Sequence, residues 1–443
     1  MRLKNVLTRI VAVMLIICMF ISISPIVNVK TSKAGVEVDA NDPNNDGPDV
    51  NNNNNDPGNT GADVGGEVTD PNSHEPIRVD VEASDGDEGG GGKLDIDRDG
   101  FYRSPQDDAG KKTEGYIAIK SAEDLISLRN NIDKNKNYTK GKKFKLLNNI
   151  DLKSYCGGSK GDWKPIGTWK SEGHAFYGEF DGLGYTISGL YIGDGTEAEG
   201  LFGEIDDGGI IKNLVVEGDV FGTYNVGGIV GVNGAGGLVQ NCLYRGNVTA
   251  TKYVGGVIGF CTGGACRKTY FSGKVTGDDI VGGISGDCGR LDGCIAQGIV
   301  MSKNTKAGGI VGETAHPTVN CINYCTVTAG SFAGGIAGFS YECSGDYGDI
   351  EKCINRGNIK GRKYIGGIVG QALRKVTDCK NEGSVSGNES FGDIIGSGDA
   401  SLVTGSVIGK GNKTIIFVMI GVFLVAFACG IIFVKKRKRG NYE

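Results

Sequence analysis

Cysteine has the most regular spacing of the chemically reactive residue types in this chain of 443 residues. Five cysteines each stand 13 or 14 residues before the next Gly-Gly or Gly-Asp pair, and Thr269 takes that place once. The five are Cys242, Cys294, Cys321, Cys353 and Cys379. A position that recurs in a repeat stacks like side chains, so we predict a cysteine column inside the protein. We expect buried free thiols that pack as small apolar groups.

Disulfides are the alternative for this column, because stacked strands bring Cα atoms to about 4.8 Å. Parallel side-chain directions, however, do not naturally give the dihedral angle of a disulfide. Cys261 and Cys288 form a second matching pair, each five residues after the second glycine of a phrase. Cys18 and Cys429 lie in apolar segments, and the other eleven cysteines are an odd number, so at least one stays unpaired in a monomer. No Cys-x-x-Cys pair or nearby histidine supports a zinc site.

Carboxylates and histidines are the other candidates for chemistry. A polysaccharide lyase or hydrolase needs two or three carboxylates that converge on one face. The candidates by residue type are Asp181, Asp206, Asp207, Asp278 and Asp279. They stand in glycine-rich predicted turns, so we expect structural aspartates rather than a catalytic set. The histidines, which are isolated from one another, are His74, His174 and His316. The sequence has no His-Glu-x-x-His motif, which argues against a zinc peptidase.

One acidic motif suggests weak Ca²⁺ binding. The segment DIDRDG places Asp95, Asp97 and Asp99 as in the first half of an EF-hand loop. Gln106 stands where such a loop has a glutamate, and no helical pattern flanks the motif. A solvated acidic linker is the simpler interpretation, and we predict no other cofactor or metal.

Aromatic residues recur at predicted turns and offer a possible binding face. They are Tyr224, Tyr253, Tyr270, Phe332 and Tyr364. Exposed tyrosines suit contact with a carbohydrate or a protein. Packing over the glycines of neighbouring coils accounts for them equally well, and the sequence does not distinguish the two.

A glycine phrase sets the architecture that must position these residues. Gly-Gly followed by an aliphatic residue begins at 227, 255, 282, 308, 334 and 366, with a degenerate copy at 392 and GLFG at 200–203. The resulting period is 26–28 residues, with one interval of 32. Each unit holds short β-rich runs without helical periodicity. We predict an all-β, right-handed parallel β-helix of about eight coils.

The aliphatic residue of each phrase should recur as an inward-facing column that no single coil buries alone. The column is Ile229, Val257, Ile284, Ile310, Ile336 and Ile368. The glycines should allow backbone conformations and close approaches that other residues do not. A helix should begin at Ser121 and cap the N-terminal end, with Leu125, Leu128 and Ile132 on its buried face.

These motifs resemble the GLUG repeats of bacterial surface proteins, over roughly residues 115–398. GLFG at 200–203 matches the phrase that gives those repeats their name, and the GGIVG copies match its commonest form. Such repeats occur in adhesins and upstream of the zinc peptidase domain of immunoglobulin A-cleaving proteases. The resemblance implies a β-helical stalk or binding surface rather than a particular reaction.

The two ends indicate a single-pass surface protein. A basic start and an apolar run predict a signal peptide at 1–34, with an uncut N-terminal anchor as the alternative. An acidic disordered tail should follow at 35–114. The segment 115–199 should form the cap and first coils, 200–398 the repeats and 399–414 a linker. Residues 415–434 are twenty residues without a charge, which is long enough to span a bilayer. The basic tail 435–443 belongs on the cytoplasmic side.

We therefore expect a Gram-positive-type, cell-surface-anchored adhesin or display protein without catalytic activity. Its partners would be the lipid bilayer, through 415–434, and an extracellular protein or glycan. SLVTG at 401–405 is a degenerate sortase signal that lacks the usual proline, so wall attachment stays possible. The net charge of −5 implies no nucleic-acid partner. A polysaccharide-active enzyme and a purely structural spacer are the alternatives.

Overall fold

The computed structural model describes residues 115–169, 173–342 and 348–408. The signal peptide, the acidic tail with its Ca²⁺ candidates and His74, the segment 415–434 and the basic tail all lie outside these ranges. Among the helices in the described ranges, none has the length and apolarity needed to cross a membrane.

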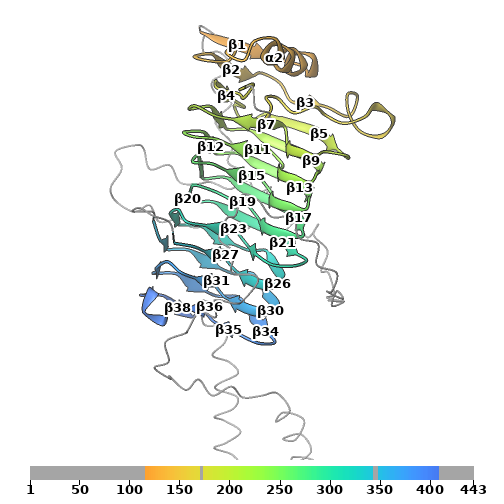
Figure 1. Ribbon diagram of the computed structural model, residues 1–443. Coiled ribbons are helices and arrows are strands. Elements are labelled where there is room, and N and C mark those ends of the chain that lie inside the picture. The colour runs from red at the N-terminus through yellow and green to blue at the C-terminus, as the bar shows by residue number, and fades with distance from the viewer. Residues whose placement is uncertain (1–114, 170–172, 343–347, 409–443) are drawn as a thin grey trace, which may run out of the picture. The chain divides into compact units, whose positions relative to one another are not determined.

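The described residues form a parallel β-solenoid, which confirms the predicted all-β class (Figure 1). Three sheets run along it, and every pairing between named strands is parallel. Sheet 1 has eleven strands, sheet 2 has nineteen and sheet 3 has eight. Each complete coil passes through a strand of sheet 1, then sheet 2, then sheet 3, before the next coil begins.

The strands of sheet 1 are β1 (Tyr116–Ile119), β2 (Lys143–Leu146), β4 (Glu179–Asp181), β8 (Ile210–Lys212), β12 (Leu238–Gln240), β16 (Ala265–Arg267), β20 (Arg290–Asp292), β24 (Thr318–Val319), β28 (Ile350–Glu351), β32 (Val376–Thr377) and β37 (Val403–Thr404). Those of sheet 3 are β7 (Phe202–Ile205), β11 (Val230–Asn233), β15 (Ile258–Cys261), β19 (Ser285–Asp287), β23 (Val311–Thr314), β27 (Ala337–Ser340), β31 (Val369–Ala372) and β36 (Ile395–Gly398).

Sheet 2 contains the longest strands. They are β3 (Ile150–Asp151), β5 (Thr186–Ile192), β6 (Glu197–Glu199), β9 (Val215–Phe221), β10 (Tyr224–Gly227), β13 (Leu243–Thr249), β14 (Lys252–Gly255), β17 (Tyr270–Gly277), β18 (Asp279–Gly282), β21 (Ile295–Ser302), β22 (Ala307–Gly308), β25 (Ile322–Asn323), β26 (Thr326–Gly334), β29 (Ile354–Asn355), β30 (Ile359–Gly366), β33 (Lys380–Asn381), β34 (Val385–Gly387), β35 (Phe391–Gly392) and β38 (Val407–Ile408).

The number of coils differs from the prediction. Eleven stacked strands in sheet 1 leave ten intervals, so the solenoid has about ten coils rather than eight. The additional coils come from the N-terminal region, which lacks the glycine phrase. There β2 joins the ladder through Phe144, paired with Phe180 of β4, and both rings are fully buried. Backbone ladders and large apolar side chains thus build coils without the phrase.

The length of a coil also varies more than the glycine spacing indicates. Register partners Lys143 and Glu179 are 36 residues apart, whereas Ala265 and Arg290 are 25 residues apart. Residues added or lost between strands leave the ladder intact, because its backbone hydrogen bonds need only the strands themselves.

The predicted helix is present as α2 (Ala122–Lys134) at the N-terminal end of the solenoid (Figure 1). The Asp124 carboxylate accepts a hydrogen bond from the Ser121 backbone N–H at 3.2 Å, which fixes the start of the helix. Leu125, Leu128 and Ile132 are buried, as predicted. The short 3₁₀ segments are η2 (Gly158–Lys160) and η3 (Ala400–Leu402).

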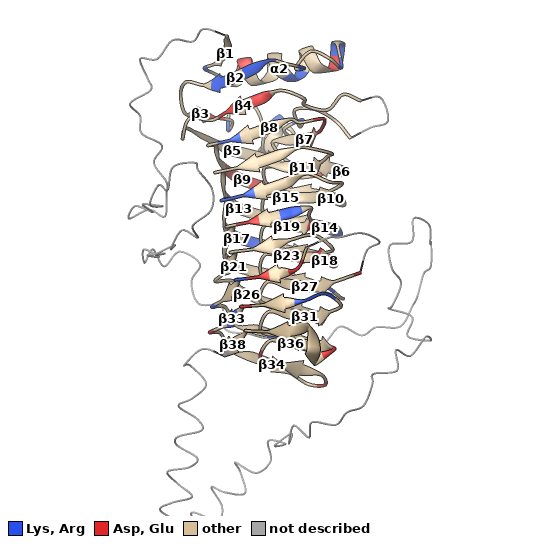
Figure 2. Ribbon diagram, turned by 90° about the vertical axis from the view of Figure 1, so that its left-hand side faces the viewer, with Lys and Arg blue, Asp and Glu red and all other residues tan. Residues whose placement is uncertain are grey.

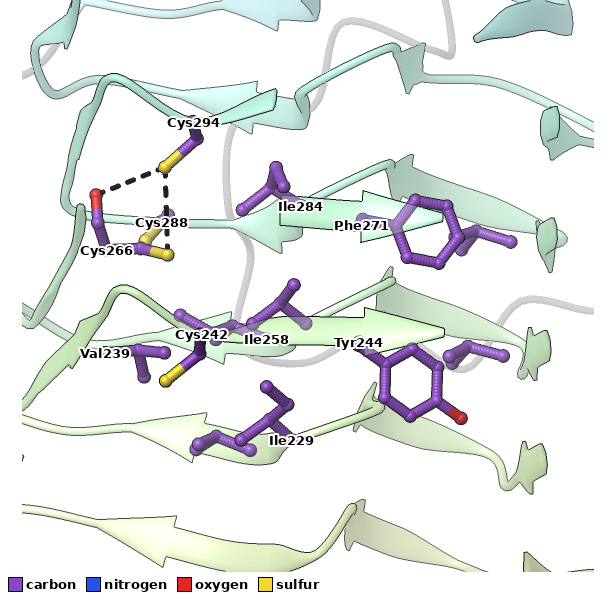
Figure 3. Packing of buried hydrophobic residues seen from close by; sticks show 14 of the residues in the cluster. Ile229, Val239, Cys242, Tyr244, Ile258, Cys266, Phe271, Ile284, Cys288 and Cys294 are labelled. Atoms are coloured by element: carbon purple, nitrogen blue, oxygen red, sulfur yellow. Dashed lines mark hydrogen bonds between the residues drawn. The ribbon is translucent and has the colours of Figure 1, made fainter. Parts of the chain in front are cut away.

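The core is built from columns of residues that repeat from coil to coil. The six aliphatic residues of the glycine phrase are all completely buried, which confirms the predicted inward column. One stretch of a second column, on sheet 2, passes from aromatic rings to amides, with Val216 before it and Ile408 after it. Its members are Tyr244, Phe271, Ala296, Asn323, Asn355 and Asn381. Figure 3 shows Ile229, Tyr244 and Phe271 among these packed side chains.

The glycines are required for close approach. A Cβ atom on Gly228 would lie 2.4 Å from three carbons of the Tyr244 ring. One on Gly231 would lie 2.3 Å from the Ala198 carbonyl carbon in the preceding coil. Neither glycine has a positive φ, so the expectation of special backbone conformations is wrong for the phrase itself. The positive φ instead belongs to the residue two before the first glycine, such as Asn225 (56°) or Tyr253 (56°).

Candidate functional site

The structure places the candidate catalytic aspartates in separate structural roles. The Asp181 carboxylate, buried at β4, accepts hydrogen bonds from the Leu183 N–H (3.0 Å) and the Asn213 amide (3.0 Å). Asp207 pairs with Lys140 at 3.0 Å. These contacts use the carboxylates to hold the corners between strands.

The remaining aspartates lie on other parts of the coils. Asp206 follows β7 of sheet 3, whereas Asp278 and Asp279 stand at the start of β18 in sheet 2. Asp278 pairs with Lys303 at 2.7 Å, and Asp279 accepts a hydrogen bond from the Thr305 hydroxyl. In the described ranges no group of three or more His, Cys, Asp or Glu residues is arranged to hold a metal ion. The structure therefore does not bring the candidate carboxylates together.

The two histidines in the described ranges are also apart in the fold. His174 lies just before the β4 coil, and its carbonyl accepts the Thr168 N–H at 3.1 Å. His316 lies between β23 and β24, five coils further along the solenoid, where burial and then the Arg374 charge lower its pKa.

Three of the five predicted aromatic residues share one position. Tyr253, Phe332 and Tyr364 all precede the glycine phrase by two residues and have positive φ. Phe332 and Tyr364 stack at 4.9 Å between ring centroids. Tyr224 stands one position earlier and is 46% exposed, while Tyr270 lies on β17.

The shared position belongs to a small second core, which we call the arch. The arch contains Tyr253, Phe260, Phe332, Phe339 and Tyr364. In each coil it lies where the glycine phrase folds the sheet 3 strand back against the sheet 2 strand that precedes it. Tyr253 contacts Phe260 at 4.8 Å, and Phe332 contacts Phe339 at 5.8 Å. These rings pack against one another, and Phe332 is buried, so their positions are explained by ring packing within the arch.

The arch also contains buried ionisable groups. Asp287 and Glu313 are register partners on adjacent coils, and the Lys306 ammonium lies 2.7 Å from the Glu313 carboxylate. Burial, and then the Glu313 charge, hold the pKa of Asp287 well above its usual value. At the equivalent position of β7, burial and the nearby Asp206 raise the pKa of Glu204 from 4.5 to about 7. The Glu204 carboxyl is thus partly protonated near neutral pH.

The five column cysteines lie at one position, just after the corner between sheets 1 and 2. All are buried with free thiols, as are the other five cysteines of the described ranges. The Cys353 thiol donates to the Glu351 carbonyl at 3.2 Å, and Cys321 donates to Val319 at 3.3 Å. Burial raises the pKa of the Cys242 thiol to about 12, which makes it unreactive.

The outer surface of sheet 2 carries a different set of residues, which we call the tyrosine–arginine face. It is formed by Arg245, Tyr270, Gln297, Tyr324 and Arg356. All are half-buried except Arg356, which is exposed. Charged residues are spread along the ladder rather than gathered on a single coil (Figure 2).

Cross-coil contacts hold this face in place. The Arg356 guanidinium donates to the Tyr324 hydroxyl at 2.6 Å and pairs with the Glu382 carboxylate at 2.8 Å. The Tyr270 hydroxyl donates to the Gln297 side-chain oxygen, and burial raises the pKa of Tyr270 to about 12. The side chains are therefore preorganised for hydrogen bonding.

Sequence reasoning singled out Tyr270 but missed the rest of the face. A signal was present, because Arg245, Tyr324 and Arg356 each follow a column cysteine by three residues. In a strand, a residue three positions after an inward one faces outward, so the cysteine period also marks the outer face.

Comparison with known proteins gives short or distant matches. No family model matches the chain. The "Putative Gly-rich membrane protein" of Evansella cellulosilytica is 34% identical over 110 residues, which cover 24% of this chain and 12% of that protein. The "Halomucin" of Haloquadratum walsbyi is 31% identical over 125 residues, or 27% of this chain and 1% of that protein. The chain thus spans only a small part of the curated relatives it matches.

A solved structure shows a distant likeness. The crystal structure of a "putative immunoglobulin A1 protease" from Bacteroides ovatus has a TM-score of 0.43 and 17% sequence identity. The match covers 66% of this chain and 86% of that one. None of these matches assigns the chain to a family.

Proposed function

We propose that this protein is a non-catalytic, cell-surface-anchored adhesin or display protein with a right-handed, GLUG-type β-helix. An extracellular protein or glycan would bind along the tyrosine–arginine face. The chain would be exported by the segment 1–34 and held in the bilayer by 415–434, with wall attachment through 401–405 as a variant of the same arrangement. The name of the Evansella relative, which includes "membrane protein", is in line with this anchor.

The observation that carries the proposal is the tyrosine–arginine face itself. Tyrosine and arginine are among the residue types most enriched at binding hot spots. Here they lie on successive coils, held by cross-coil hydrogen bonds, on the sheet with the longest strands. The candidate carboxylates, in contrast, are dispersed and engaged in structural contacts. Binding without turnover fits this distribution better than glycan cleavage.

The experiment is a binding screen on cells that display the full chain. Arrays of glycans and of extracellular matrix proteins would be probed, and captured ligands recovered for mass analysis. We expect saturable binding to an intact ligand, weakened tenfold or more by Tyr324→Ala or Arg356→Ala. Arg267→Ala is the matched control, since Arg267 is also exposed but lies on sheet 1.

Two results would count against the proposal. If the control and the two face variants weakened binding equally, the face would not be the binding site. If recovered glycans were shortened, the protein would be an enzyme, and the roles of Asp181, Asp206 and Asp278 would need to be tested by substitution.

A further inference from the structure

The column cysteines make a recurring contact with the preceding coil. The Cys242 thiol lies 3.6 Å from the Ile211 carbonyl oxygen, and Cys353 lies 3.3 Å from that of Thr318. The equivalent contact of Cys294 is with the carbonyl of Cys266, at 3.5 Å. Ile211, Cys266 and Thr318 occupy one inward position on sheet 1. Where that position is a cysteine, two thiols face each other.

At this place the two sulfurs are in contact. The Sγ atoms of Cys266 and Cys294 are 3.9 Å apart, and both side chains are completely buried. Figure 3 shows the two sulfur atoms directed toward each other across adjacent coils. Other buried thiols also interact, such as Cys261 with Cys288 and, along the column, Cys353 with Cys379.

The direction of approach distinguishes this pair from the column. Successive column cysteines stack with parallel side chains, which disfavours the disulfide dihedral angle. Cys266 instead projects from β16, before the corner, whereas Cys294 projects from the segment just after β20. Because they approach from two sides of a corner, their side chains are not held parallel as those of the column are.

We propose that Cys266 and Cys294 are oxidised to a disulfide that links two adjacent coils of the mature protein. Both S–H bonds break and one Sγ–Sγ bond forms. The oxidant is an external disulfide, such as oxidised glutathione, which reacts by thiol–disulfide exchange. It takes up the two electrons and two protons and is reduced to two thiols. The oxidant acts before the coils close over the thiols, since both are inaccessible afterwards. The column cysteines other than Cys294 stay as free thiols.

The bond would close a loop between residues that are 28 apart in sequence. Restricting the unfolded chain in this way stabilises the folded state. In vivo, the reaction rests on the proposed export of the chain, because disulfides persist in oxidising compartments. It does not depend on ligand binding, so the two proposals can fail separately.

The test is a disulfide map of the full chain. The protein would be unfolded, refolded in a mixture of reduced and oxidised glutathione at about −200 mV, alkylated without reduction, digested and analysed by mass spectrometry. We expect one linked peptide pair, Cys266 with Cys294, and alkylated thiols elsewhere. The Cys266→Ala and Cys294→Ala variants should each lose it. Cys325→Ala, which removes an equally buried thiol whose pKa is raised by burial alone, should retain it.

A second measurement uses stability. A reductant should lower the Tm of the wild type by about 5 °C or more and leave that of Cys266→Ala unchanged. Alkylation of both thiols in the refolded wild type would overturn the proposal. So would a different pair, such as Cys261 with Cys288. If refolding failed, the same map made on chain purified from expressing cells would decide in the same way.

Discussion

The contact between Gly228 and Tyr244 gives a direct test of why the repeat contains a second glycine. A Cβ atom at position 228 would lie 2.4 Å from three ring carbons of Tyr244, about 1 Å inside van der Waals contact. The ring has no room to move, because its hydroxyl donates to the Gly218 carbonyl at 2.7 Å and its face stacks on Phe271 at 6.4 Å. We therefore expect Gly228→Ala to destabilise the protein through this one ring.

The magnitudes follow from the two single changes. Gly228→Ala overpacks the core and should cost about 2–3 kcal/mol of unfolding free energy. Tyr244→Ala leaves a cavity and should cost about 4 kcal/mol. In the double variant the ring is gone, so the new methyl group enters the cavity without a clash. We expect the double variant to cost about 4 kcal/mol, which corresponds to a coupling of about 2–3 kcal/mol between the sites.

The assay is urea denaturation followed by the loss of β-sheet circular dichroism in all four members of the cycle. The control combines Gly228→Ala with Val376→Ala, a fully buried residue on β32, where the two costs should add to within about 0.5 kcal/mol. Additive costs for Gly228 and Tyr244 as well would refute the reasoning, because the penalty would then arise from the backbone at the corner rather than from the ring.

Three other predictions concern buried polar groups. Folding raises the pKa of Glu204 from 4.5 to about 7, so protonation of this carboxyl stabilises the folded state. The resulting contribution to the free energy of unfolding is complete below about pH 4.5 and is lost as the pH rises through 7. Thermal scans from pH 5 to 8 should show about 2 kcal/mol of this loss, after allowance for solvent screening, and Glu204→Gln should remove it. Asn355→Ala breaks amide bonds of 2.8 Å on both sides and should cost about 2–4 kcal/mol in urea denaturation, more than Asn381→Ala, whose own amide N–H₂ already lacks a partner. Lys306→Met leaves the Glu313 carboxylate buried without its ion pair and should cost about 3 kcal/mol at pH 8, with Glu313→Gln in the same chain restoring most of it; no restoration would mean that Lys306 acts by packing.

Local patterns in the sequence predicted the fold class and the inward columns. The glycine phrase, the aliphatic residue after it and the cysteines keep fixed positions in each repeat, and parallel in-register stacking turns a fixed position into a column. The same reasoning placed the helix at Ser121, because capping and the helical period depend on near neighbours alone. For these features the sequence period is itself the structural period.

The number of coils, the arch and the tyrosine–arginine face were decided by the tertiary structure. Coils at 115–199 lack the phrase, yet their backbone ladders and rings such as Phe144 keep the register. The proximity of Cys266 to Cys294, and of Asp287 to Glu313, joins residues from different coils. Coil length varies between those residues, so their separation in sequence does not determine which side chains meet. Hydrogen bonding between the strands sets that register, and it acts only once the coils are stacked.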